Sequence, residues 1–320
     1  MYVGEDEALL VETVTKFVSD EVKSVARQWE TQGIPSELWA SLGELGLLAI
    51  TTSEDRGGAG LRLRDLGLVT AYLAQGDLAL GWAVSRHNQA LSILAASGHQ
   101  ALDSYLTGQQ RLDWSHTTTG LLPRGCDALV VVNEHDVALY QCCTLTDVDA
   151  PIGGRGLGSR IETASTPDAT QSMQVDHALL RAEATLLAAC VGWGLGSSAL
   201  KAATHYALDR EQFGKPIAQF QAIQWKLADG AMLLEAAELL IEHALQNVHQ
   251  TAAAMALKAT IDAVMKLVDD GLQTHGGYGY TEDFDIEKYY RDAQFLAGQL
   301  GTRRGQSLQI AHDILNQVRD

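Results

Sequence analysis

QTHGGYGYTEDFDIEKYYRDA (residues 273–293) and DREQFGKPIAQFQ (residues 209–221) are the two stretches that reveal most about the architecture. In the first, a helix ends at a pair of glycines, which let another backbone or a ligand approach closely. In the second, a helix end is followed by a glycine loop and by a proline at the start of the next helix. Each spacing taken alone also fits an ordinary helix cap or helix–loop–helix.

Long helices rich in alanine and leucine surround these stretches, over residues 177–210, 221–248 and 251–273, and a last helix begins near Thr302. Antiparallel helices of this kind form a bundle. The first third of the chain is helical too, and a nearly all-apolar helix over residues 77–98 is expected to be buried on several sides. Apolar side chains recur at helical spacing in the first helix: Leu10, Val14, Phe17, Val18, Val22 and Val25.

The middle of the chain has a different pattern. ALVVV, DVALYQC and SMQVD are typical of strands, and glycine, proline, aspartate and threonine separate them. PIGGRGLGSR is expected to be a loop, because it lacks the strand-then-helix context of a dinucleotide fingerprint. The sequence therefore predicts a mainly α protein with a small β-domain, divided into residues 1–108, 109–176 and 177–320.

Composition excludes several classes of protein. The chain has 320 residues, is 46% hydrophobic and carries a formal net charge of -17, so nucleic acid and anionic membranes are unsuitable partners. It has no uninterrupted apolar run of about 18 residues, and its acidic N-terminus lacks the layout of a signal peptide. Cys126, Cys142, Cys143 and Cys190 fit no metal or redox spacing. We expect reduced thiols, no metal and a cytoplasmic location.

In combination, the two stretches strongly resemble the acyl-CoA dehydrogenase family of flavoproteins. LGELGLLAITTSEDRGGAGL (residues 42–61) and the helix carrying His87 resemble the N-terminal part of that family. The resemblance implies an N-terminal helical domain, a middle β-domain and a C-terminal four-helix bundle, assembled through the C-terminal helices with FAD at a subunit interface. The implied activity is α,β-dehydrogenation of an acyl-CoA, with an electron-transfer flavoprotein as the usual acceptor.

The resemblance also implies cofactor-binding residues. The two motifs belong to the part of the family that reaches the FAD of the neighbouring subunit. Carried over residue by residue, six positions are expected to make that contact: Arg210, Gln212, Phe213, Gln273, Gly276 and Gly277. The arginine lies near the pyrophosphate, where a guanidinium forms a strong charge-assisted pair. The glutamine and glycines of the second motif line the adenosine part.

The catalytic base of the family has no counterpart here. In most members it is a glutamate immediately before a Gly-Thr that opens the last helix, and here Leu300 precedes Gly301-Thr302. Other members carry the glutamate on the helix before the DREQFG-like motif, at the position of Ala184. Glu183 is the alternative acid, although one step along a helix turns a side chain by about 100°. No catalytic residue is predicted in this chain.

The middle domain departs from the family as well. The segment of the type ALTEP…GSD, which holds the flavin and a phosphate in the family, is absent from YLTGQQRLDWSHTTTGLLPRGCDALVVV (residues 105–132). Ser115, Thr117, Thr118 and Thr119 could form a remnant, but no pattern identifies them as one. Losses of this kind resemble the reduced subunit of α2β2 acyl-CoA dehydrogenases such as those of bacterial steroid catabolism.

Three hypotheses follow. In the first, the chain is the reduced subunit of a heteromeric FAD-dependent acyl-CoA dehydrogenase, inactive alone, which completes the FAD site of a paralogous full-length partner; the resemblance suggests a steroid-derived acyl group. In the second, it is a self-sufficient homomeric dehydrogenase with a displaced acid such as Glu183. In the third, it is a non-catalytic scaffold of the same fold.

Overall fold

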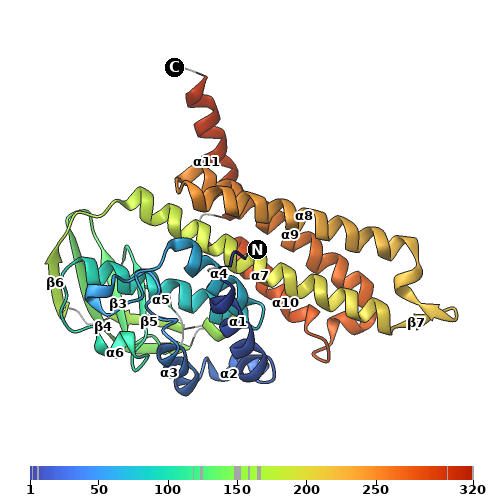
Figure 1. Ribbon diagram of the computed structural model, residues 1–320, viewed down its shortest axis with the longest axis horizontal. Helices are drawn as coiled ribbons and strands as arrows, with labels where there is room; N and C mark the ends of the chain where they lie inside the picture. Colours follow the sequence, from blue (N-terminus) through green and yellow to red (C-terminus); the bar gives the residue numbers. More distant parts are fainter. Residues whose placement is uncertain are drawn as a thin grey trace.

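The computed structural model of the chain has helices at both ends and strands between them (Figure 1). The structure describes residues 1, 3–5, 7–117, 119–122, 125–147, 153–157, 159–163, 167–300 and 302–318. In Figure 1 the sheet lies at one end of the molecule, the long C-terminal helices extend to the other end, and α11 projects away from the body.

The N-terminal helices pack around a shared apolar centre. The helix predicted over the first segment is two helices joined by a π-helical turn, which keeps Val14, Phe17 and Val22 buried together. Gly46, with φ +72°, follows the next helix as predicted. The elements are α1 (Ala8–Phe17), the π-turn (Val18–Val22), α2 (Ala26–Gln32), α3 (Ser36–Glu44), α4 (Leu63–Ala74), α5 (Leu78–Ala96) and α6 (Asp103–Leu106).

The described strands form a six-stranded sheet in the order β1-β3-β4-β5-β2, with β6 pairing β4. Only the β1–β3 pair is parallel among them. Two predictions were wrong in detail: the strand expected at SMQVD lies earlier, and the end of the expected PIGGRGLGSR loop begins a strand that pairs with two others. The bounds are β1 (Leu112–Ser115), β2 (Thr119–Leu122), β3 (Ala128–Val132), β4 (Asp136–Asp147), β5 (Ser159–Thr163) and β6 (Ala169–Ser172).

The C-terminal helices are α7 (His177–Asp209), α8 (Gln221–Gln246), α9 (Gln250–His275), α10 (Ile286–Gly298) and α11 (Thr302–Gln317). A two-stranded hairpin, β7 (Glu211–Gln212) with β8 (Lys215–Pro216), connects α7 to α8. By length and composition α7 could span a membrane, but 78% of its most apolar window is buried inside the protein, as in a core helix. The sequence patterns do not predict α10, whose first residues belong to the glycine-containing stretch at residues 273–293.

One hydrophobic cluster extends through both helical regions. It contains side chains from α1 to α5 together with side chains from α7 to α10. A second cluster lies between α5, the sheet and the start of α7. The side chain of Leu300, between α10 and α11, packs against both clusters. The sheet is therefore attached to a single helical core, and the predicted boundaries at residues 108 and 176 remain predictions.

His87, on α5, fastens the sheet to the helices. Its Nδ1 accepts a hydrogen bond from the backbone N–H of Leu112 at 3.0 Å, and its Nε2 lies 3.2 Å from the carbonyl oxygen of Tyr105. Both bonds are satisfied when the neutral ring carries its proton on Nε2. Burial lowers the pKa of His87 from 6.5 to about 3, and the bond to Tyr105 offsets this only partly.

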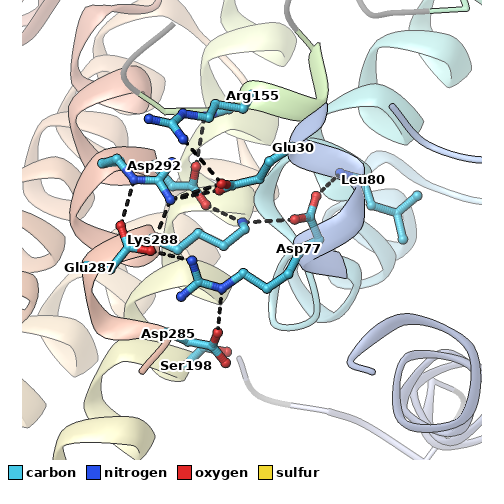
Figure 2. Close-up of polar contacts among 12 residues, drawn as sticks. Glu30, Asp77, Leu80, Arg155, Ser198, Asp285, Glu287, Lys288 and Asp292 are labelled. Carbon is cyan, nitrogen blue, oxygen red and sulfur yellow. Dashed lines mark hydrogen bonds and ion pairs between the residues drawn. The ribbon is translucent and has the colours of Figure 1, made fainter. Parts of the chain in front are cut away.

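Lys288, on α10, forms a buried ion network with the N-terminal region (Figure 2). Its Nζ lies 2.9 Å from Asp77 and 2.6 Å from Asp292. Asp77 also caps α5 by accepting from the N–H of Leu80, and Asp292 accepts from the N–H of Gly154. Although burial opposes the charged form, the two carboxylates raise the pKa of Lys288. The network joins α10, the start of α5 and the segment before β5.

We expect Lys288→Met to destabilise the protein by about 3–5 kcal/mol, because it leaves two buried carboxylates without their cation. The matched control is Lys258→Met, which removes a partly exposed i,i+4 pair with Asp262 and should cost about 1 kcal/mol or less. Urea unfolding measures both effects. Equal shifts of the unfolding midpoint in the two variants would show that the buried network stabilises the protein no more than a partly exposed ion pair does.

We also expect His87→Gln to change the pH dependence of stability. The unfolded chain protonates this histidine below its ordinary pKa of 6.5, while the folded protein does not until about pH 3. The free energy of unfolding therefore decreases as the pH falls from about 6.5 toward 3, by up to about 1.4 kcal/mol per pH unit. Urea unfolding between pH 5 and 7.5 should show this slope in the parent protein relative to the variant. His135→Gln, at an exposed position, is the control and should retain it.

Candidate functional site

Five of the six predicted cofactor-binding residues line one cavity of about 480 Å³ at the end of α7 and α9. We call it the Arg210 groove. The predicted members are Arg210, Gln212, Gln273, Gly276 and Gly277. The sequence did not single out five further lining residues, because their contribution depends on tertiary packing: Tyr206, Ile217, Thr274, His275 and Thr281. The two motifs are thus brought together although a long helix separates them.

Arg210 ends α7 and carries the charge of the groove. Its backbone is extended, and its carbonyl oxygen accepts from the N–H of Ile217, which fixes the chain as it leaves the helix. The guanidinium carbon lies 5.7 Å from the centre of the Tyr278 ring, in a cation–π arrangement. In the part of the chain that the structure describes, Arg210 has no ion-pair partner. Its donors are therefore available to an anionic ligand.

The floor of the groove is rigid. The rings of Tyr206 and His275 stack with their centroids 4.0 Å apart, and the Tyr206 hydroxyl donates to the carbonyl oxygen of His275 at 3.3 Å. Burial lowers the pKa of His275, against a hydrogen bond to the carbonyl of Gly271. Gly276 then ends α9 at φ +61° and ψ -137°, a conformation that a residue with a Cβ rarely adopts. The glycine pair leaves open space beside the stacked rings of Tyr206 and His275.

Phe213, the sixth predicted residue, stands apart from the groove. It occupies the tip of the β7–β8 hairpin, its side chain is 94% exposed, and its backbone is left-handed at φ +54°. Its ring meets the Phe220 ring edge-on at 6.2 Å. The hairpin lies at the opposite end of the bundle from the sheet (Figure 1). A large aromatic side chain in this position is displayed outward rather than packed against its own chain.

A second cavity, of about 360 Å³, lies where the sheet meets α5, α7 and the segment between α10 and α11. Both positions at which a base was sought, Ala184 and Leu300, line it. Glu183 does not line it; burial and the charge of Asp176 raise the pKa of Glu183, which remains half-buried elsewhere on α7. We call it the Leu300 cavity, and no carboxylate lines it among the residues that the structure describes.

Basic and aromatic side chains make up the rest of this lining. Arg86 and Arg181 come from α5 and α7, and Trp114, Ser115 and His116 come from the end of β1. Arg181 precedes Ala184 by three residues, so the two share a face of α7. The three-residue spacing is therefore the feature of the sequence that could have placed Arg181 beside Ala184.

The hydroxyl residues considered as a remnant of the family's flavin-binding segment divide between the cavity and a local turn. The Ser115 hydroxyl lines the cavity and accepts from the backbone N–H of Thr117 at 3.1 Å. Thr118 lies outside the described residues, as does Gly301 before α11, and the side chain of Thr119 is not described.

Thr302 begins α11 at φ +63°. Arg303, one residue on, pairs with Asp262 of α9 at 2.5 Å.

Comparison with known proteins identifies relatives for both helical regions. Residues 4–108 match the N-terminal domain, and residues 174–315 the C-terminal domain, of acyl-CoA dehydrogenases. A 3-(aryl)acrylate reductase of Clostridium sporogenes is 40% identical over 127 residues, which are 38% of this chain and 34% of that protein. This match therefore spans about a third of the relative's length.

Two longer likenesses cover nearly the whole chain. An acyl-CoA dehydrogenase of Mycolicibacterium smegmatis, IpdE2, is 27% identical over 322 residues, covering 98% of this chain and 100% of the relative. The solved structure of butyryl-CoA dehydrogenase from Megasphaera elsdenii superposes with a TM-score of 0.87 at 19% identity, covering 98% of this chain and 99% of that one. The second likeness shows the fold.

The exposed, left-handed Phe213 generates a prediction. We expect Phe213→Gly to stabilise the isolated chain by up to about 1 kcal/mol, because a left-handed backbone costs a residue with a Cβ about 1–2 kcal/mol and the exposed ring loses only its edge-on contact with Phe220. Phe213→Ala keeps the Cβ and is the control. Chemical denaturation of both variants is the measurement; identical midpoints would mean that the hairpin relaxes without penalty.

Proposed function

Since this chain belongs to the acyl-CoA dehydrogenase family, we propose that it is the base-less subunit of a heteromeric, FAD-dependent acyl-CoA dehydrogenase. Its partner is a paralogous full-length subunit in an α2β2 assembly, which supplies the catalytic glutamate and the larger β-domain. This chain completes the partner's FAD site in trans and is inactive alone. The reaction is α,β-dehydrogenation of an acyl-CoA thioester.

The observation that carries the proposal is that Leu300 and Ala184 face the same cavity. Proton abstraction needs a base within hydrogen-bonding reach of the substrate, and an aliphatic side chain stands at each position where the family keeps one. The half-buried Glu183 lies off the lining, which disfavours a displaced base. The chain therefore has the fold of the enzyme without the group that removes the proton.

The distance between the two sites supports action in trans. Ala184 lies near the start of α7 and Arg210 just beyond its end, 26 residues later, which is about 40 Å along a helix. The Arg210 groove therefore cannot serve the Leu300 cavity of its own chain. The outward display of Phe213 agrees with a ligand held mainly by another subunit.

The groove suits the part of FAD assigned to it. Arg210 is placed to bind the pyrophosphate, since its guanidinium is free of ion pairs within the described residues and a charge-assisted bond to phosphate is strong. Gln273 offers amide hydrogen bonds, and Gly276 and Gly277 leave space for the adenosine. When bound, FAD supplies the hydride acceptor for the reaction. This chain's residues orient and enclose the cofactor's far end.

The wider setting follows from the family. We propose an electron-transfer flavoprotein as the electron acceptor and a cytoplasmic location. The acyl group we propose is steroid-derived, on the resemblance to the heteromeric enzymes of bacterial steroid catabolism.

Co-expression with the paralogous subunit tests the proposal. The purified complex should contain FAD and oxidise acyl-CoA, and Arg210→Gln should weaken FAD retention about tenfold or more, because hydrogen bonds to charged groups contribute about 1.5–3 kcal/mol. Flavin absorbance per mole of complex is the readout, independent of activity. Lys16→Gln, an exposed lysine on α1, is the charge-matched control and should retain the FAD.

Three results would contradict this assignment. If the lone chain binds stoichiometric FAD and oxidises an acyl-CoA, it is self-sufficient, and loss of activity in Glu183→Gln would then identify the displaced base. If the complex forms but Arg210→Gln leaves its flavin content unchanged, the chain is a scaffold. If no complex forms with the paralogue, the heteromer is wrong.

A further inference from the structure

Positive charge is concentrated at the Leu300 cavity of a strongly acidic protein. The chain carries 40 acidic and 23 basic residues, yet two arginines and a histidine line this cavity and, among described residues, no carboxylate does. A surface of average composition would present more acids than bases. The lining is therefore suited to an anion, which the remainder of the protein repels.

The two arginines differ in whether their guanidinium groups already have partners within the protein. Arg86 is held in place: its Nε lies 2.7 Å from the buried carboxylate of Asp113, its Nη2 donates to the carbonyl of Trp114, and its guanidinium covers the Trp114 ring at 4.3 Å. Asp113 therefore neutralises much of its charge. Arg181 has no ion-pair partner within the described ranges, and it is exposed. Its charge remains available to a ligand.

His116 forms another part of the same wall. Its Nδ1 donates to the carbonyl oxygen of Val132 at 3.1 Å, and its ring packs between Trp114 and His177 at centroid distances of 5.5 and 5.2 Å. These contacts fix the ring, and because a carbonyl only accepts, Nε2 of the neutral ring is an acceptor that offers a carboxylate no hydrogen bond. Ser115, next in the chain, contributes a hydroxyl to the lining.

The remaining wall is apolar. Leu300 and Ala184 line it together with the ring of Trp114. The left-handed backbone of Leu300, at φ +51°, is kept by its carbonyl oxygen accepting from the buried amide of Gln306 and by packing against both hydrophobic clusters. Such a conformation costs about 1–3 kcal/mol and persists only when its surroundings impose it. The leucine is thus a fixed part of the wall.

We propose that the Leu300 cavity binds a small amphipathic carboxylate in this chain. The carboxylate is held by the guanidinium of Arg181 beside Ser115, and the apolar body packs on Trp114, Ala184 and Leu300. A planar fork of N–H donors matches a carboxylate in a bidentate arrangement. The volume of about 360 Å³ lies in the range of small-molecule sites. Binding needs neither a partner subunit nor FAD.

Calorimetric titration of the full chain with benzoate tests the proposal. Benzoate should bind saturably, and benzyl alcohol, which has the same ring without the charge, should bind at least tenfold more weakly. Arg181→Gln should lower the affinity for benzoate about tenfold, the effect of losing a hydrogen bond to a charged group. Arg304→Gln, an exposed arginine on α11 outside the lining, should leave it unchanged. Because Arg181 is exposed, its variant should keep the parent's melting temperature.

Three results of this titration would contradict the proposed carboxylate site. Absence of saturable heat with benzoate overturns the proposal, as does equal weakening in Arg181→Gln and Arg304→Gln, which would reflect only the general charge. If inorganic phosphate displaces benzoate at equal concentration, the apolar wall contributes nothing and the amphipathic ligand is wrong. The titration contains neither the partner subunit nor FAD. A negative result with benzoate would therefore leave the proposed in-trans role untouched, and the reverse also holds.

Discussion

The ammonium group of Lys288, buried between Asp77 and Asp292, sets the relation between the two ends of the chain (Figure 2). An unpaired charge cannot be buried at acceptable cost, so α10 and the start of α5 must meet here with their side chains in register. Around this centre Arg291 bridges Glu30 and Glu287, which adds α2 to the junction. The hydrophobic cluster shared by both helical regions surrounds the same point, but apolar packing alone would tolerate sliding.

The position of α5 then places the sheet. His87 and Arg86 are neighbours on this helix, and they bond to successive residues of β1, Leu112 and Asp113. The junction with α10 is tight: a Cβ on Gly153 would lie 1.8 Å from the carbonyl oxygen of Arg291. The sheet is thus attached along one edge, and the Leu300 cavity is the space left where the sheet meets α7.

The single helix α7 separates two kinds of chemistry. Near its start, Ala184 and Arg181 face a cavity that has aliphatic groups where a base would stand, with cationic groups beside them. At its end, Arg210 and the stacked Tyr206 and His275 form a groove in which the guanidinium has no ion-pair partner among the described residues. Under the proposed function these two features belong together, because the chain lacks a base at one end of α7 and completes the FAD site of another subunit with Arg210 at the other.

Much of this was accessible from the sequence, because helical periodicity and glycine or proline signals act locally. They predicted most of the helices and the small β-region, whereas the roles of Arg210 and Gln273 and the missing base at Leu300 follow from the family resemblance and remain predictions. The extra strand β5, the helix α10, the gathering of Arg181 with Leu300 and the buried partners of Lys288 were not predictable in this way. Strand pairing, cavities and buried ion pairs depend on side chains far apart in sequence, and only tertiary packing decides which of them meet and which lose contact with water.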